Sequence, residues 1–409
     1  MNYKLRIILI AGTYLPERCS ISDYTARLSA ALRQYGVECI VLTTYYAAEA
    51  AYDPNAVGVV HGWRWADLRA LVQAVRDRQP DVLHIVYSAS SYNFETAIFL
   101  LPLLLRMTGW RSPIVTTVYE YGQGKGQINK IPLLPIKWLK LWSQHRHWWD
   151  RENGFLLRLS DAVIATSTEV KAAHQQLPLK NSVFHIPVAA NVDVASIEPT
   201  VARQMLRKNC QWPDDAVAIA FFGFIQPGKG LETLLKAFKQ VWESHSQVRL
   251  LLIGGGESLA CSGEKARKYW FQLQTLIAEL GLLHRVHLTN YISAETVSHY
   301  LTGADIGVLP SDRGVTLNST LLTLLAHGLP VVATQSQTLP AAHPVQFVPP
   351  QDDDALVAAL LKLLDNPVKR TQLSAASRIV GQSFAWEHIA KAHLDIYSDL
   401  ITSLWLKKW

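Results

Sequence analysis

Leu5-Arg6-Ile7-Ile8-Leu9-Ile10 is a nearly continuous run of apolar side chains close to the start of the chain. A parallel sheet that is buried on both faces requires strands of this kind. A helical pattern follows, with Ser22-Asp23 at its start and Gly36 at the position that favours a left-handed cap. The next expected strand, over residues 38–42, comes directly afterwards. This order of strand, helix and strand predicts a parallel sheet.

The same alternation continues through both halves of the chain. Further strands are expected over residues 81–87, 113–118, 162–165 and 183–186, and then over 217–222, 248–253, 286–288, 306–309 and 331–333. Helices are expected between them, for example over 230–245 and 320–327. The pattern predicts an α/β fold with two Rossmann-like, doubly wound parallel-sheet domains. Open parallel sheets bind ligands at the carboxyl ends of their strands, so two facing sheets would hold a ligand in the cleft between them.

Length and composition limit the class of protein. A chain of 409 residues is too long for one domain of ordinary size. Its composition, with 49% hydrophobic and 18% charged residues, excludes a disordered, collagen-like or coiled-coil chain. Lys and Arg outnumber Asp and Glu by 39 to 33, a mild excess that suits phosphates or an anionic membrane surface without requiring nucleic acid. The four cysteines have no metal-binding spacing, and no signal peptide or spanning segment is found. We therefore expect a reduced, cytoplasmic protein without structural metal.

The expected domain boundaries follow from the two sets of strands. We place the first domain over residues 1–198, the second over 199–383, and a C-terminal helix over 384–409. The linker is expected within 195–215, because this segment carries Pro199, Pro213 and mixed charges.

A glycine-rich loop over 223–230 is the first candidate site. It lies between an expected strand and an expected helix, and it contains Lys229. A helix start presents unpaired backbone N–H groups and a positive dipole end, and Lys229 adds a cation, so the loop suits a phosphate. The spacing is not that of a Walker loop. A plain glycine-rich turn with a solvated lysine is the alternative.

A second loop, over 310–320, has the same position between a strand and a helix. Thr316, Asn318, Ser319 and Thr320 offer hydroxyl, amide and backbone groups at the helix start. Simple N-capping by Asn318 or Ser319 would explain these residues without a ligand. Two phosphate-competent helix starts in one domain nevertheless favour an anionic ligand more than either alone.

A third candidate is the loop over 117–122, at the end of a first-domain strand. Glu120 in this loop is a candidate base or acceptor of a substrate hydroxyl, and an ordinary surface loop is the alternative. The chain contains no HExxH, DxD or GxSxG motif. This argues against zinc hydrolysis, metal-bound sugar-nucleotide chemistry of the single-domain type, and serine hydrolysis.

Residues 124–149 combine basic charge with tryptophan. The segment has five basic residues and no acidic one, and Trp138, Trp142 and Trp149 fall on one face of a helix. A basic, tryptophan-rich amphipathic helix is typical of a membrane-surface segment. The alternative is a helix packed in the core with solvated lysines.

Taken together, the motifs resemble the retaining family-4 glycosyltransferases of the GT-B fold over nearly the whole chain. The resemblance is carried by the loop at 13–24, the strands at 81–85 and 115–118, and the stretches 223–230, 252–256, 304–311, 326–334 and 384–390. It implies an enzyme that moves a sugar, in the manner of a hexosyltransferase, from a nucleotide-diphosphate sugar to an acceptor with retention of configuration. It also implies that the first domain receives the acceptor and that the final helix crosses back to it. Because the sequence has no DxD motif or metal-ligand cluster, we expect Lys229 and helix starts to neutralise the donor diphosphate without a metal.

The resemblance assigns roles to individual positions. Lys229, Tyr119 and Glu120 would act in catalysis. The donor would be bound by Ser20, Gly223, Lys229, Tyr291, Ile292, Asn318, Ser319, Thr320 and Thr323. The sequence does not identify the acceptor, which is expected to be a sugar, a lipid-linked acceptor or a polymer. Peripheral membrane contact through residues 124–149 is a hypothesis at this point.

Several positions depart from the family pattern. Val315 and Thr323 stand where two glutamates are usual, and Tyr119 stands where a histidine is expected. Phe224 replaces a common arginine, and Cys19-Ser20 replaces a glycine pair. Part of the family has a hydroxyl-rich loop instead of the glutamates, which 312–320 resembles. The competing hypothesis is a non-catalytic GT-B protein that binds or scaffolds. A nucleotide-sugar epimerase of the same fold matches the motifs less well.

Overall fold

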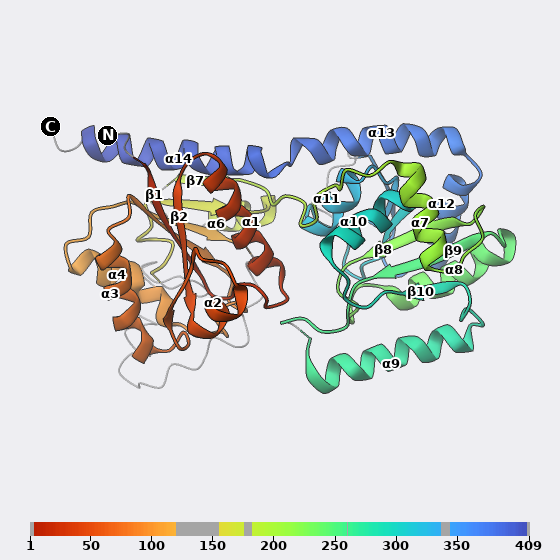
Figure 1. Ribbon diagram of the computed structural model, residues 1–409, viewed down its shortest axis with the longest axis horizontal. Coiled ribbons are helices and arrows are strands. Elements are labelled where there is room, and N and C mark those ends of the chain that lie inside the picture. Colours follow the sequence, from red (N-terminus) through yellow and green to blue (C-terminus); the bar gives the residue numbers. More distant parts are fainter. Residues whose placement is uncertain (1–3, 120–154, 176–181, 260, 337–343, 407–409) are drawn as a thin grey trace. The chain divides into compact units, whose positions relative to one another are not determined.

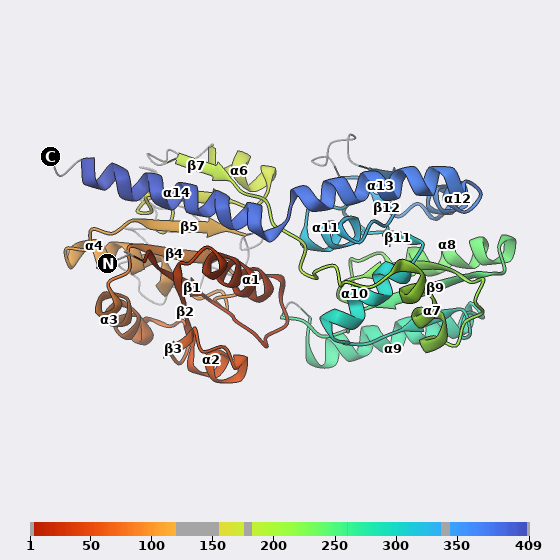
Figure 2. The ribbon, with the colours of Figure 1, turned by 45° about the horizontal axis from the view of Figure 1, so that its top comes forward.

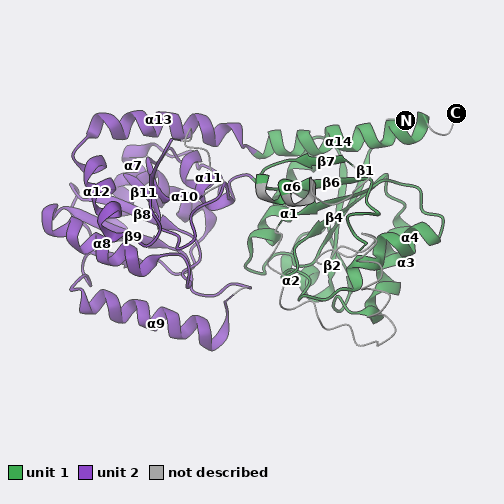
Figure 3. Cartoon of the chain, turned by 180° about the vertical axis from the view of Figure 1, so that it is seen from behind, with its two compact units in different colours: residues 1–188, 386–409 green, residues 189–385 purple. Residues whose placement is uncertain are grey.

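The computed structural model describes residues 4–119, 155–175, 182–259, 261–336 and 344–406. The chain divides into two compact units, Met1–Val188 together with Trp386–Trp409, and Ala189–Ala385 (Figure 3). Each unit is a parallel sheet with helices packed against it, as the alternating sequence pattern predicts (Figure 1).

The first unit contains a sheet of seven described strands in the order β3-β2-β1-β4-β5-β6-β7. Its strands are β1 (Arg6–Ala11), β2 (Glu38–Thr44), β3 (Ala56–Val60), β4 (Val82–Tyr87), β5 (Ile114–Val118), β6 (Ala162–Ala165) and β7 (Ser182–His185). Its helices are α1 (Ser20–Gln34), α2 (Tyr45–Ala51), α3 (Leu68–Arg78), α4 (Leu101–Met107), α6 (Thr168–Gln175) and α14 (Trp386–Leu406), with short 3-10 turns at Trp65–Asp67 and Ala97–Leu100. All strand pairs are parallel.

The second unit contains a sheet of six described strands in the order β10-β9-β8-β11-β12-β13. Its strands are β8 (Val217–Phe222), β9 (Val248–Ile253), β10 (Val286–Leu288), β11 (Ile306–Leu309), β12 (Val331–Thr334) and β13 (Val345–Val348). Its helices are α7 (Pro199–Asn209), α8 (Leu231–Ser244), α9 (Gly263–Glu279), α10 (Ala294–Gly303), α11 (Ser319–Ala326), α12 (Asp353–Leu364) and α13 (Pro367–Ser383). Figure 2 shows the helices of this unit around the sheet.

The linker lies earlier in the chain than expected. The first unit ends at Val188, whereas the sequence boundary was placed after residue 198. The segment that follows Val188 already belongs to the second unit, because Asn191 is hydrogen bonded to Thr323 and the Ala195 amide donates to Ser298 Oγ at 2.7 Å.

The expected linker over 195–215 is largely helical instead. Pro199 is the first residue of α7, a position where a helix tolerates proline. On this helix the Arg207 guanidinium is almost completely buried and pairs with Asp305 at 2.7 Å. Asp305 also accepts the Ala218 amide at 2.8 Å, so α7 is fixed to the sheet of the second unit.

The helix at the C-terminus belongs to the first unit, although it follows the second unit in sequence. Alternation along β4 explains how it is held. Leu83 and Ile85 pack in the core that also contains residues of α3 and α4, whereas His84 points to the opposite face. There His84 is hydrogen bonded to Tyr397 of α14 at 2.5 Å and to Thr117 of β5 at 2.7 Å.

A second buried bond repeats this arrangement one turn earlier. His393 of α14 is hydrogen bonded to Tyr24 of α1 at 3.1 Å, and its ring stacks on His84 with centroids 5.6 Å apart. Both imidazoles are fully buried, and burial lowers the pKa of His84 well below its usual value and that of His393 to about 4. Helix α14 is therefore attached through neutral histidines.

Candidate functional site

The second sheet reverses its direction of growth between two neighbouring strands. From β8 the chain adds β9 and β10 on one side, and it then crosses over to add β11, β12 and β13 on the other. The loops that follow β8 and β11 therefore start at adjacent carboxyl ends of the sheet. In open parallel sheets this switch point is where ligands bind.

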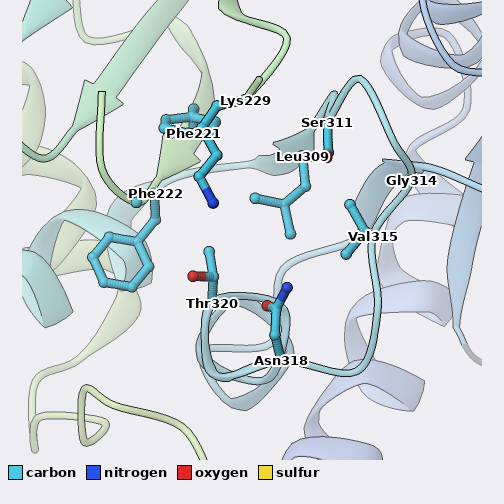
Figure 4. A pocket seen from close by; sticks show the side chains of 10 residues that line it. Phe221, Phe222, Lys229, Leu309, Ser311, Gly314, Val315, Asn318 and Thr320 are labelled. Atoms are coloured by element: carbon cyan, nitrogen blue, oxygen red, sulfur yellow. The ribbon is translucent and has the colours of Figure 1, made fainter. Parts of the chain in front are cut away.

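A pocket lies at this switch point (Figure 4). It is lined by Phe221, Phe222, Gly223, Lys229, Leu309, Ser311, Gly314, Val315, Asn318 and Thr320. These residues come from the ends of β8 and β11, the two loops that follow them, and the start of α11. The empty space between these residues has a volume of about 380 Å³, including the part that is open to solvent.

Close backbone contact joins the two loops of the pocket. Gly230 has a φ of +70°, and a β carbon there would lie 1.8 Å from the carbonyl oxygen of Pro310. The Asp312 amide donates to the Gly228 carbonyl at 3.2 Å. Glycine at position 230 is needed both for the left-handed backbone and for this approach. The loop that carries Lys229 is therefore held against the loop after β11.

Cationic and polar groups define one part of the pocket. Lys229 is half-buried, and its ammonium group points into the space (Figure 4). Helix α8 starts two residues later, after Gly230, which has no side chain that could cap the first amides. Ser311 and Thr320 add hydroxyl groups to the lining. A cation, hydroxyls and a helix start attract an anion such as a phosphate.

Asn318 is already engaged in the structure. Its side chain caps α11 by accepting the Leu321 amide at 2.9 Å. The capping expected from the sequence is thus present, and Asn318 also lines the pocket. Ser319 is the first residue of α11 and is largely buried, and it is not among the lining residues.

Thr323 lies one turn into α11, away from the pocket lining. Its side chain is fully buried. Its hydroxyl lies 2.8 Å from both Asn191 Oδ1 and the Ser319 carbonyl, and it accepts the Asn191 amide at 3.1 Å. The hydroxyl of Thr323 therefore fixes the segment that follows Val188. Val315, at the place of the other usual glutamate, does line the pocket.

Tyr291 and Ile292 follow β10 and do not line this pocket. The Tyr291 ring covers Gly255, where a β carbon would lie 2.1 Å from the ring. Ile292 packs against the hydrophobic core of the second unit.

The remaining predicted residues lie in the first unit or outside the described residues. Ser20 is the first residue of α1, next to a buried cluster in which the Cys19 thiol and the hydroxyls of Thr13 and Ser22 lie within 3.2 Å of one another. Tyr119 follows β5, and its ring meets Tyr24 edge-on at 5.7 Å. Glu120 and the segment 124–149 lie outside the described residues.

The structure thus gathers Gly223, Lys229, Asn318 and Thr320 in one pocket. It adds lining residues to which the sequence assigned no role, above all Phe222 and Leu309 at the strand ends and Ser311 in the loop. The sequence feature that could have identified these residues is their position at or just after the carboxyl ends of two buried strands. This feature becomes informative only when the order of the strands in the sheet is known.

Among the residues that the structure describes, no three or more His, Cys, Asp or Glu side chains gather as they would around a metal ion. No helix within them is long and apolar enough to cross a membrane.

Comparison with known proteins places the chain in a family. Residues 21–193 match the model of Glycosyltransferase Family 4, and residues 202–380 match that of Glycosyl transferases group 1. A phosphatidyl-myo-inositol mannosyltransferase from Mycobacterium leprae is 25% identical over 56% of this chain and 57% of its own length. The chain spans about half the length of the curated relatives it matches.

Solved structures extend the likeness over the whole chain. Sucrose-phosphate synthase from Thermosynechococcus elongatus has a TM-score of 0.72 at 21% identity, covering 98% of this chain and all of that one. HepE from Anabaena in complex with UDP and glucose has a TM-score of 0.70 at 13% identity, covering 97% and 100%. At these identities the likeness shows the fold, which is GT-B. Since the two family models match successive halves of a GT-B chain, the protein belongs to the family-4 glycosyltransferases.

Proposed function

We propose that this glycosyltransferase takes its sugar from a nucleotide-diphosphate sugar, and that the donor diphosphate binds in the pocket at the ends of β8 and β11. The observation that carries the proposal is the Lys229 ammonium, which points into this pocket beside the start of α8. Departure of the sugar leaves negative charge on the diphosphate. A cation and a helix dipole that are already in place stabilise that charge as it develops.

The other lining residues have distinct roles in this proposal. Thr320 and Ser311 bind phosphate oxygens through their hydroxyls, and Gly223 lets the donor approach the backbone. Ser20, Tyr119 and Glu120 orient the donor sugar or the acceptor from the first unit. The HepE neighbour was solved with UDP and glucose, which supports a nucleotide-linked hexose as the donor.

Transfer proceeds with retention of configuration and without a metal ion in this proposal. Lys229 and the helix starts supply the positive charge that a divalent cation supplies in other sugar-nucleotide enzymes. The protein positions the two substrates and excludes water from the reacting centre. The leaving diphosphate then departs from the same pocket that bound it.

A donor screen tests the proposed function. Purified protein is incubated with UDP-, GDP-, ADP- and dTDP-linked hexoses, each with and without excess chelator, and released nucleoside diphosphate is measured. We expect hydrolysis of at least one donor, and the chelator should leave this turnover unchanged. NMR recorded before mutarotation should show that an α-linked donor releases the α anomer of its hexose. Binding of nucleotide diphosphates without any turnover would instead favour a non-catalytic scaffold. A strict requirement for Mg²⁺ or Mn²⁺ would contradict the proposal that Lys229 and the helix starts take the place of a metal ion.

We further propose that the enzyme works in the cytoplasm against a sugar, lipid-linked or polymeric acceptor, with membrane contact through residues 124–149. Support comes from the sequence of that segment, with five basic residues, no acidic residue and three tryptophans on one face. Each lysine near an anionic leaflet contributes about 1 kcal/mol. Co-sedimentation with anionic vesicles should weaken with salt and with Lys137→Glu plus Lys140→Glu. Absence of binding at low salt would assign the segment to an ordinary core helix.

A further inference from the structure

Lys229 is the last residue of a tight turn. The turn is Gln226-Pro227-Gly228-Lys229, and the Lys229 amide donates to the Gln226 carbonyl at 3.3 Å. Proline and a left-handed glycine, with φ +87° at Gly228, stand at its two central positions, the arrangement that a type II turn favours. Pro227 and Gly228 are exposed to solvent. The direction in which the lysine leaves the turn therefore depends on how the first residue, Gln226, is held.

The start of the turn is held by the loop that follows β9. The Ile225 amide donates to the Gly255 carbonyl of this loop at 2.9 Å. Beside this backbone contact, the Ser258 hydroxyl donates to Oε1 of the Gln226 side chain at 3.0 Å. Ser258 is only 7% exposed and Gln226 is half-buried, so water competes little for this hydrogen bond. The turn is thus joined to the neighbouring loop by a side-chain bond as well as by its backbone.

Ser258 is itself fixed in one orientation. Its backbone exchanges two hydrogen bonds with the backbone of Cys261, at 2.8 and 3.1 Å. Its Oγ also accepts the Cys261 amide at 3.2 Å. Because Oγ is the acceptor in that bond, its own hydrogen is available for Gln226 Oε1. Ser258 therefore presents a rigidly oriented donor to the glutamine.

A separate contact holds the other part of the turn. The Asp312 amide of the loop after β11 donates to the Gly228 carbonyl at 3.2 Å. Loss of the bond between Ser258 and Gln226 would leave this contact in place. The turn would then stay folded, while its first residue and the direction of the Lys229 side chain would be less well defined.

We propose that Ser258 and Gln226 are positioning residues for Lys229. Neither side chain lines the pocket, whereas the Lys229 ammonium points into it (Figure 4). The pair therefore acts on a bound diphosphate through the lysine and not by contact. A cation stabilises the charge of the diphosphate best when it is held in place beforehand. This inference rests on the proposed function, because it assumes that Lys229 meets the donor diphosphate.

A double-mutant cycle with Lys229 tests the inference. Titration calorimetry is done with whichever of UDP, GDP, ADP and dTDP binds the wild type most tightly. Gln226→Leu removes the acceptor and leaves the bonds between Ser258 and Cys261 in place. We expect it to raise the Kd about threefold or more. In a Lys229→Ala background the same substitution should leave the Kd unchanged, because no ammonium remains to be positioned.

Two further variants complete the cycle. Ser258→Ala removes the donor of the same bond, so it should raise the Kd by the same factor as Gln226→Leu. Combining the two substitutions should raise the Kd no further than either alone. Gln272→Leu is the matched control, because Gln272 is an exposed glutamine of α9 and should bind like the wild type in both backgrounds. Circular dichroism shows that each variant is folded.

The outcomes distinguish this inference from the proposed function. If Lys229→Ala weakens binding but folded Gln226→Leu does not, the positioning role is overturned and the proposed function stands. An equal loss from Gln226→Leu in the wild-type and Lys229→Ala backgrounds would also overturn it, because the pair would then act on the fold and not through the lysine. Unchanged binding by Lys229→Ala, or no binding of any of the four diphosphates, would overturn the proposed function and the inference with it.

Discussion

Gly230 and the carbonyl of Pro310 are in direct contact across the switch point of the second sheet. A β carbon built on Gly230 would lie 1.8 Å from the Pro310 carbonyl oxygen, so no side chain fits there. This contact joins the loop after β8 to the loop after β11, and both line the pocket that receives Lys229. The positions of the two loops are therefore coupled, and the geometry of the pocket depends on a residue without a side chain.

Replacing this glycine should damage the protein more than replacing its neighbour Gly228. Gly228→Ala has only the left-handed backbone to overcome, at φ +87° with open space around it, which costs about 1–2 kcal/mol. Gly230→Ala has a similar backbone cost and must also push the loops apart, which adds about 1–3 kcal/mol. Urea unfolding of both variants measures the difference. Equal stability of the two would show that the loops are not tightly joined.

Thr323→Val separates two possible roles of the threonine. Valine keeps the shape but removes the hydroxyl, which leaves the Asn191 amide and side chain without this partner. We expect a loss of about 1–3 kcal/mol in the free energy of unfolding. Affinity for nucleotide diphosphates should be unchanged, because Thr323 is fully buried outside the pocket lining. A large drop in affinity with normal stability would restore the donor contact that the family resemblance implies.

Acid should destabilise the first unit through His84 and His393. Both pKa values lie below the value of about 6.5 in an unfolded chain. Below pH 6.5 the unfolded state therefore binds more protons than the folded state, so stability falls as the pH drops from 6.5 towards 4. Above pH 7 both states are neutral and the effect vanishes. Each histidine contributes about 1 kcal/mol per pH unit within that window.

Urea unfolding at pH 7.5, 6.5, 5.5 and 5.0 checks this dependence. His393→Gln removes one titrating group, so the variant should lose stability less steeply between pH 6.5 and 5.0 than the wild type. A wild-type midpoint that stays constant from pH 7.5 to 5.0 would contradict the account of α14 as a helix attached through neutral histidines.

Much of the fold could be predicted because central strands of a parallel sheet are apolar on both faces. The runs at β1, β4, β8 and β9 are of this kind, and each was predicted within one or two residues. The two strands that were missed, β3 and β13, are both at sheet edges. β3 also contains Gly58, and a glycine weakens the apolar pattern by which a strand is predicted. The structure shows why glycine stands there, because Tyr45 occupies the space that a side chain would need.

The candidate site was only partly predictable for a related reason. The strand–loop–helix pattern pointed to Gly223, Lys229, Asn318 and Thr320, all of which line the pocket. The local sequence pattern does not reveal that β8 and β11 are neighbours in the sheet, because 83 residues separate the end of β8 from the start of β11. The bond between His84 and Tyr397 spans 313 residues and was equally invisible.

Titration calorimetry of nucleoside diphosphates against wild type and Lys229→Ala shows whether the donor diphosphate binds at the ends of β8 and β11. A charge-assisted hydrogen bond contributes about 1.5–3 kcal/mol, so loss of the ammonium should weaken binding about 10-fold or more. Lys236→Ala is the matched control, because Lys236 is an exposed lysine of α8 and should bind like the wild type. Affinity that is unchanged in a folded Lys229→Ala variant would contradict the placement of the donor diphosphate in this pocket.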